Sequence, residues 1–172
     1  MKFIIALIVL SGIFQCSKGN PTGHIKIVGG EDAELGQFPH QVLWAYNGNV
    51  FCGGSIYNTS TIITAAHCCK VFEDGEQLHG QLELTSIMAG RIDIDDIVNG
   101  QEKSVKSYLI HPDYLGVSDH INDICLLTLE NELEFNYSVN AIGLNTEIVE
   151  VGTKCIVSGW GATTVSFSIA SN

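Results

Sequence analysis

The stretch "IITAAHCC" at residues 62–69 places His67 between a short apolar run and two cysteines. An imidazole can act as a general base because its ordinary pKa lies close to physiological pH. A base alone hydrolyses nothing, since it must take a proton from a nucleophile and be held in one orientation. A solitary histidine is more often a surface or satisfied polar residue, so the rest of the chain must supply the partners of His67.

The N-terminal segment has the pattern of a secretory signal peptide. A lysine follows Met1, residues 3–10 are all apolar, and a small or polar run occupies 15–19. The apolar run is too short to cross a bilayer, and no later stretch reaches the roughly 20 apolar residues of a transmembrane helix. We expect residues 1–19 to be removed, at an approximate boundary, and the protein to be secreted and extracellular with no membrane partner.

The chain of 172 residues is acidic, with a formal net charge of −11. Beyond residue 26, five basic residues face all 19 acidic ones, a net charge of −14 with histidine neutral. This balance disfavours a nucleic-acid partner and is typical of a solubilising surface. Asn58-Thr59-Ser60 and Asn136-Tyr137-Ser138 match the N-glycosylation acceptor pattern, so Asn58 and Asn136 are glycosylation candidates in a secreted chain.

Short runs rich in β-branched, aliphatic and aromatic residues alternate with glycine, asparagine and aspartate. The pattern predicts strands at 41–46, 51–57, 61–66, 82–89, 105–111, 124–129 and 154–158. No segment sustains helical periodicity over ten residues, and there is no internal repeat. An all-β barrel or sandwich is therefore expected, with His67 directly after the strand at 61–66.

Six motifs follow one another along the chain: "KIVGG" at 26–30, "FCGGSI" at 51–56, "TAAHCC" at 64–69, "HPDY" at 111–114, "NDICLL" at 122–127 and "CIVSGWG" at 155–161. Together they resemble the chymotrypsin-like (trypsin) family of secreted serine endopeptidases, from about residue 26 to 161. The resemblance implies an all-β chymotrypsin-like double β-barrel fold. Only the first barrel and the start of the second are expected in this chain.

The resemblance also assigns catalytic roles. The histidine of "TAAHC" is the general base in that family and the aspartate of "DIxLL" orients it, so the matching residues are His67 and Asp123. A serine hydroxyl is a poor nucleophile until an imidazole accepts its proton, and a carboxylate fixes the tautomer and stabilises the imidazolium. Protein or peptide substrates are the implied partners.

The "KIVGG" motif implies a zymogen. Cleavage between Lys26 and Ile27 would release a new N-terminus that, in relatives, inserts into the second barrel beside the nucleophile. Residues 20–26 are then an activation propeptide and 27–172 the protease domain. A basic residue before the cut implies a trypsin-like activating protease, and the family also admits protein inhibitors as partners.

The nucleophile is absent from this sequence. Relatives carry "GDSGGP", which supplies the serine and the oxyanion-hole amides, and no such motif occurs here. The late serines lack the flanking glycines that this turn needs: Ser158, Ser166, Ser168 and Ser171. The 146 residues after Lys26 also fall short of the roughly 200–250 of many β-barrel domains. We expect a domain incomplete at its C-terminus and inactive alone, the alternative being a non-catalytic homologue or truncated product that acts only by binding.

Cysteine counting agrees with that expectation. Without Cys16 of the signal peptide, five cysteines remain, an odd number for a secreted chain. The family resemblance implies a Cys52–Cys68 bridge around the histidine loop. It also implies that Cys155 is left unpaired, because its usual partner belongs to the second barrel.

The other two cysteines support a hypothesis of their own. Cys69 and Cys125 each lie two residues beyond a catalytic candidate, His67 and Asp123 respectively. If those two candidates meet, a Cys69–Cys125 bridge would lock their segments together. The alternative is two buried free thiols, which are less common in an oxidising compartment.

No metal or cofactor is expected. Many trypsins bind calcium in the loop equivalent to 90–102, beginning with a glutamate after the glycine, but Arg91 occupies that position here. The loop does contain oxygen ligands by type, namely Asp93, Asp95, Asp96 and Glu102. Calcium, found in relatives, is therefore doubtful in this chain, and the residues that set primary specificity lie in the second barrel.

Overall fold

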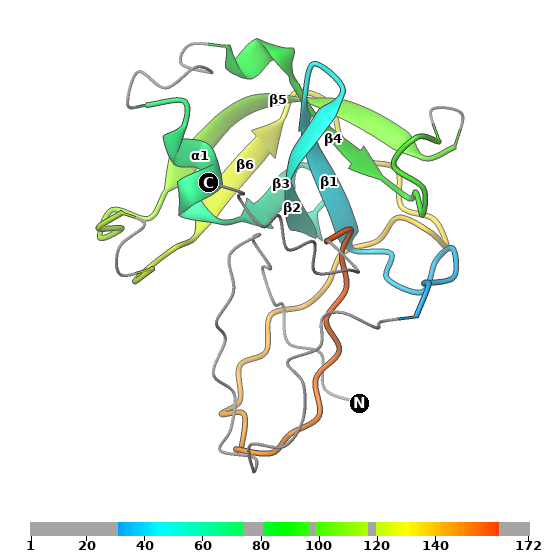
Figure 1. The fold of residues 1–172 in the computed structure, drawn as a ribbon, viewed down its shortest axis with the longest axis vertical. Helices are drawn as coiled ribbons and strands as arrows, with labels where there is room; N and C mark the ends of the chain where they lie inside the picture. Colours follow the sequence, from blue (N-terminus) through cyan, green and yellow to red (C-terminus); the bar gives the residue numbers. More distant parts are fainter. Residues whose placement is uncertain (1–30, 74–80, 97–98, 117–119, 162–172) are drawn as a thin grey trace, which may run out of the picture.

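The apolar runs between the turn residues form six antiparallel strands, and these strands close into a barrel. The computed structural model describes residues 31–73, 81–96, 99–116 and 120–161. The strands are β1 (Gln41–Tyr46), β2 (Asn49–Asn58), β3 (Thr61–Thr64), β4 (Thr85–Ala89), β5 (Gln101–Ile110) and β6 (Cys125–Leu129). They pair in the order β1-β2-β3-β6-β5-β4 and make a closed barrel, which settles the choice between barrel and sandwich (Figure 1).

Helical structure is limited to two short elements in the described residues. α1 (Ala66–Lys70) follows β3, and the 3₁₀ turn η1 (Leu82–Leu84) precedes β4. The described residues contain no helix that is long and apolar enough to cross a membrane.

An Asn-Gly pair shapes the β1–β2 hairpin. Asn47 has φ +48° and Gly48 has φ +75°, while Tyr46 pairs with Asn49 across the turn. Positive φ at both central residues defines a turn whose twist matches the twist of the strands, and Asn-Gly is the sequence that adopts it most readily.

The barrel interior is filled by aromatic and branched side chains. Trp44 is fully buried, and its ring lies 4.8 Å from that of Phe51 and 5.5 Å from that of Phe72. Ile56, Ile62, Ile87, Val105 and Leu127 complete the core from β2, β3, β4, β5 and β6. All six strands therefore depend on one apolar cluster for their stability.

Strand order brings two distant loops to the same end of the barrel. β3 and β6 are antiparallel neighbours, with Thr64 opposite Cys125. The residues after β3 and those before β6 must therefore emerge side by side, although more than fifty residues separate them in the sequence.

Four expected strands differ most from those observed. β5 starts at Gln101, four residues before the strand expected at 105–111. The strand expected at 61–66 ends at Thr64, because the chain turns into α1 at Ala66. The first three residues of the strand expected at 82–89 form η1 instead. Residues 154–158 form no strand, since within the described residues they pair with no neighbouring strand.

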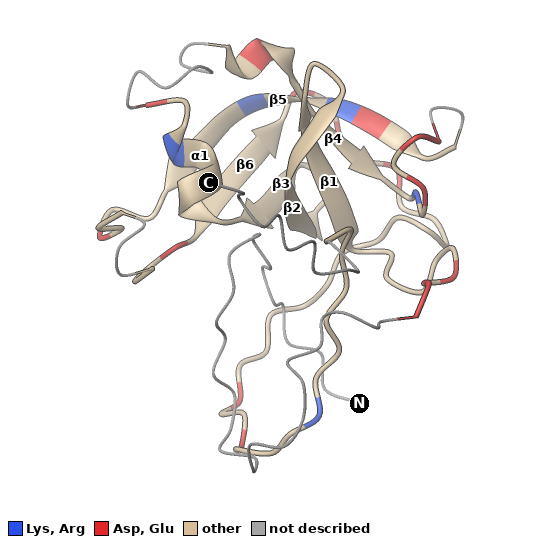
Figure 2. Cartoon of the chain, viewed as in Figure 1, with Lys and Arg blue, Asp and Glu red and all other residues tan. Residues whose placement is uncertain are grey.

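Charge is distributed unevenly over the described surface. Figure 2 shows acidic residues in several loops around the barrel, while β5 carries both basic and acidic residues and α1 carries a basic one. The expected signal peptide (1–19), the expected propeptide (20–26) and the proposed cleavage pair, Lys26 and Ile27, lie outside the described residues.

Candidate active site

His67 lies in α1, three residues after β3 ends. Thr64 closes β3 as a fully buried residue, and its hydroxyl donates a 2.7 Å hydrogen bond to the carbonyl of Gly53 on β2. Ala65 is extended (φ −83°, ψ 147°), so the chain leaves the barrel before it turns. Because α1 has only five residues and no side-chain cap at its start, tertiary contacts must hold it.

Two disulfides supply those contacts. Cys68 is bonded to Cys52 on β2, and Cys69 is bonded to Cys125 at the start of β6. Both helix cysteines are almost completely buried, at 2% and 0% exposure. The two bridges fix α1 to different strands, and the residue just before them is His67.

Asp123 is presented by a tight turn ahead of β6. His120 and Asn122 have φ of +50° and +57°, a left-handed conformation that histidine and asparagine tolerate better than most residues. The Ile124 amide donates to the Asn122 carbonyl over 2.7 Å. The Asn122 side-chain amide donates to the backbone carbonyl of Asp113 over 3.0 Å, which ties this turn to the neighbouring loop.

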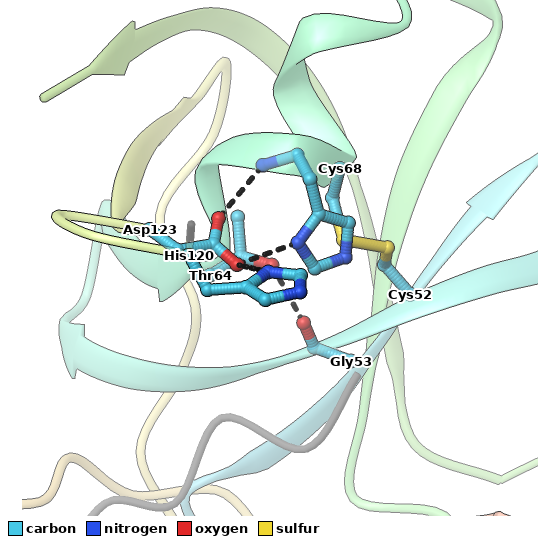
Figure 3. Close-up of polar contacts among 7 residues, drawn as sticks. Cys52, Gly53, Thr64, Cys68, His120 and Asp123 are labelled. Carbon is cyan, nitrogen blue, oxygen red and sulfur yellow. Dashed lines mark hydrogen bonds and ion pairs between the residues drawn. A yellow bond between two sulfur atoms is a disulfide. The ribbon is translucent and has the colours of Figure 1, made fainter. Parts of the chain in front are cut away.

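The two catalytic candidates contact each other at two points (Figure 3). Asp123 Oδ2 lies 2.7 Å from His67 Nδ1, and Oδ1 accepts a hydrogen bond of 2.9 Å from the His67 backbone amide. The side chains are 17% and 16% exposed. Partial burial strengthens a charge-assisted hydrogen bond, so one carboxylate holds both the ring and the backbone that carries it.

This contact decides which ring nitrogen can do chemistry. A carboxylate accepts hydrogen bonds, so Nδ1 carries the proton and Nε2 presents its lone pair. Nε2 lies 3.5 Å from Cys68 Sγ. The sulfurs of Cys52 and Cys68 and the His67 imidazole lie close enough together to hold a metal ion. However, the two sulfurs form a disulfide and are not the thiolates that bind zinc, so this group does not fit a zinc site.

A second histidine at this carboxylate was missed from the sequence. His120 Nδ1 lies 3.9 Å from Asp123 Oδ2, and the His120 side chain is 56% exposed. Its spacing of three residues from Asp123 is the only signal in the sequence, and it is uninformative without the turn that brings the two together.

Tyr114, from the "HPDY" motif, lies close enough to Asp123 for the two to interact electrostatically. Burial raises the pKa of the Tyr114 hydroxyl, the negative charge of Asp123 raises it further, and Lys70 acts in the opposite direction. The hydroxyl is buried and makes no hydrogen bond to any described residue. The phenol therefore stays neutral near the carboxylate at physiological pH.

In the loop after β4, the Arg91 guanidinium occupies the interior. Arg91 is 8% exposed; its Nε donates to the Asn99 carbonyl over 2.9 Å, and Nη2 lies 3.7 Å from Glu102 Oε2. Nearby carboxylates are engaged within the loop, since Asp96 accepts from both the backbone and the side-chain amide of Asn99. The Arg91 cation thus already lies beside the Glu102 carboxylate, and the absence of calcium remains a prediction.

The remaining site candidates lie apart from this pair. Cys155 is an exposed free thiol, and both Asn58, the last residue of β2, and Asn136, in a loop, are exposed. Ser158 donates to Gln41 Oε1 over 2.8 Å, and no hydrogen bond joins it to His67. The other late serines considered above lie outside the described residues.

Comparison with known proteins identifies the family. The family model described as Trypsin matches residues 27–169. The chain is 32% identical to Hypodermin-A of Hypoderma lineatum and 34% identical to submandibular glandular kallikrein-9 of Rattus norvegicus, in each case over 96% of this chain. It is 30% identical to a trypsin of Phaedon cochleariae, also over 96% of this chain.

The same comparisons show how much of these relatives the chain represents. It spans 61% of the length of Hypodermin-A and 62% of both the kallikrein and the Phaedon trypsin. The closed six-strand barrel with almost no helix is the chymotrypsin-like β-barrel fold. The chain therefore belongs to the trypsin family of chymotrypsin-like serine proteases.

Proposed function

We propose that this chain is part of a secreted serine endopeptidase, with His67 as the general base and Asp123 as the residue that orients it. The two-point contact of Asp123 with the His67 ring and backbone supports the proposal. The relatives point the same way, since proteins named as trypsin and serine protease are among them. Peptide bonds of proteins are the proposed substrates.

The chemistry follows from the tautomer. With Nδ1–H held by Asp123, Nε2 takes the proton of a serine hydroxyl as its oxygen attacks the substrate carbonyl. The imidazolium that forms is stabilised by the Asp123 carboxylate and then gives its proton to the leaving amine. Asp123 acts by orientation and charge and keeps its own ionised state throughout.

The serine and the oxyanion-hole amides of this reaction are not supplied by a "GDSGGP" motif in these 172 residues. We therefore propose that the 172 residues alone hydrolyse no peptide bond. Their contribution to catalysis is the base and the group that orients it.

Secretion and activation form the second part of the proposal. Residues 1–19 direct export, residues 20–26 keep the precursor inactive, and a trypsin-like protease cleaves after Lys26 to expose Ile27. The two disulfides of α1 are consistent with export to an oxidising compartment.

A chimera tests the catalytic assignment. Residues 1–160 of this chain are joined to the part of the Phaedon cochleariae trypsin that follows the corresponding position. The zymogen is secreted, activated with immobilised trypsin and separated from it. The proposal predicts casein hydrolysis and labelling by a fluorophosphonate probe, both lost in His67→Ala.

His120→Ala is the matched control, because it removes a neighbouring imidazole that has no proposed part in proton transfer. A chimera that folds with both α1 disulfides intact but keeps its activity in His67→Ala contradicts the assignment. A folded chimera with no activity at all would favour a non-catalytic binding role for this barrel.

A further inference from the structure

The first Asn-X-Ser sequence folds into a turn between β2 and β3. Asn58 Oδ1 accepts hydrogen bonds from the Ser60 amide over 2.9 Å and from the Ser60 hydroxyl over 3.2 Å. A backbone amide only donates, so the side-chain carbonyl oxygen of Asn58 must face it and the nitrogen Nδ2 must point away. Asn58 is exposed.

The second Asn-X-Ser sequence repeats this geometry in a different loop. Asn136 Oδ1 accepts from the Ser138 amide over 2.9 Å, from the Ser138 hydroxyl over 3.0 Å and from the Val139 amide over 2.9 Å. Three donors on one oxygen fix the orientation of the side-chain amide. Asn136 is also exposed.

In both places the free atom is the one that a sugar would modify. Nδ2 of Asn58 and Nδ2 of Asn136 make no hydrogen bond to any described residue, whereas Oδ1 satisfies the turn. A substituent on Nδ2 would therefore leave every hydrogen bond of these two turns intact. The folded chain can carry it without rearrangement.

Both turns lie at the end of the barrel away from the catalytic pair. β3 starts just after Ser60 and runs toward His67, and β6 runs from Cys125, near Asp123, to Leu129. The Leu129 amide donates to the Ser60 carbonyl over 2.9 Å, which marks the far ends of the two strands. Four residues of β3 at about 3.3 Å each separate this end from the catalytic end by about 13 Å.

The loop of Asn136 is fastened to the same end. The Leu133 amide donates to the carbonyl of Thr59, the middle residue of the first acceptor sequence, over 2.7 Å. The two acceptor sequences therefore share one region of the surface. Exposed aromatic rings flank the acceptors, with Tyr57 at 47%, Phe135 at 43% and Tyr137 at 71% exposure.

We propose that Asn58 and Asn136 both carry N-linked oligosaccharides, grouped on the barrel end opposite His67 and Asp123. The donor is an oligosaccharide linked to a polyisoprenyl diphosphate. The new bond joins Nδ2 to the first sugar carbon, the bond from that carbon to the diphosphate oxygen breaks, Nδ2 loses one proton, and the lipid diphosphate leaves with the electron pair. The sugars cover the exposed aromatic rings and leave the approach to Nε2 of His67 open.

This proposal rests on the secretion proposed above, and the experiment separates the two. The full chain is translated in a cell-free system with endoplasmic-reticulum microsomes and exposed to protease outside the vesicles. The expected product is protected and shows two steps of slower gel mobility that peptide N-glycosidase removes. Asn58→Gln and Asn136→Gln each lose one step, the double variant loses both, and Asn140→Gln, an exposed asparagine outside any acceptor pattern, loses none.

Each other outcome overturns a defined part of the proposal. A protected chain without mobility steps overturns the glycans and leaves secretion standing, and a single step overturns the glycan at the unmodified site. A chain that the protease digests overturns secretion and the glycans together. The placement away from the site predicts that deglycosylation leaves casein hydrolysis by the activated chimera unchanged, and a clear rise in rate would overturn it.

Discussion

Replacing Cys69 and Cys125 together by alanine removes the bridge that ties α1 to β6. Both residues are buried, at 0% and 1% exposure, so alanine avoids placing an unsatisfied hydroxyl in the core. The backbone amide and ring of His67 reach Asp123 from the helix that this bridge anchors. The perturbation therefore tests how much the covalent bond that anchors this helix stabilises the folded chain.

The expected magnitude comes from the loop that the bridge closes. Cys69 and Cys125 are 56 positions apart, whereas Cys52 and Cys68 are 16 apart. In the chain-entropy model, the longer loop corresponds to about 4 kcal/mol of stabilisation at 25 °C and the shorter loop to about 3 kcal/mol. The loss of the longer bridge should cost more, although both anchor the same five-residue helix.

Urea unfolding without reductant, followed by circular dichroism and tryptophan fluorescence, measures the difference. The Cys52→Ala/Cys68→Ala variant is the matched control, and the slope of free energy against urea should rise in both variants because their unfolded chains are less constrained. If the Cys69/Cys125 variant loses under about 1 kcal/mol, or clearly less than the control, the entropic account of this bridge is wrong.

Three further substitutions test the packing and charge of the barrel. Gly54→Ala places a methyl group 2.8 Å from an isoleucine side chain, so unfolding experiments should show a loss of about 1–3 kcal/mol, whereas Gly143→Ala, with open space around it, should be neutral. Arg91→Gln removes the cation that donates to the Asn99 carbonyl, so the free energy of unfolding should fall by about 1–3 kcal/mol. If added calcium raises the urea midpoint of the unsubstituted chain, this account of the loop is contradicted. Burial lowers the pKa of His40 from its ordinary value of 6.5, so the unfolded state binds the proton more readily than the folded state. His40 should not affect stability above pH 6.5, whereas the free energy of unfolding should fall as the pH drops below 6.5, and it should fall less in His40→Gln.

The sequence predicted a strand well where the features that form it, a β-forming run and an adjoining turn, are local. The strand expected at 41–46 coincides with β1, since a run of β-forming residues and the Asn47-Gly48 turn are both local features. The strand expected at 154–158 was wrong because a run of β-forming residues needs a partner strand, and none of the described residues provides one.

The candidate site could not be predicted from local strand patterns, because its residues come together through contacts between distant segments. His67 and Asp123 could be chosen only through their motifs, and their contact depends on the antiparallel pairing of β3 and β6. His120 comes within 3.9 Å of the same carboxylate through a turn with two left-handed residues, and the buried Tyr114 hydroxyl is influenced by its charge without a hydrogen bond. Neither the turn conformation nor the burial leaves a periodic pattern in the sequence.

The most direct test of the central claim is the turnover of the activated chimera carrying Asp123→Asn, compared with Asp113→Asn on the neighbouring loop. Asparagine keeps the shape of the side chain but favours the wrong histidine tautomer, so kcat should fall by about 10⁴-fold, the magnitude characteristic of this family's triads, with little change in KM. The Asp113 carboxylate is exposed and should be dispensable. A kcat for Asp123→Asn close to that of Asp113→Asn would show that His67 and Asp123 do not work together in hydrolysis.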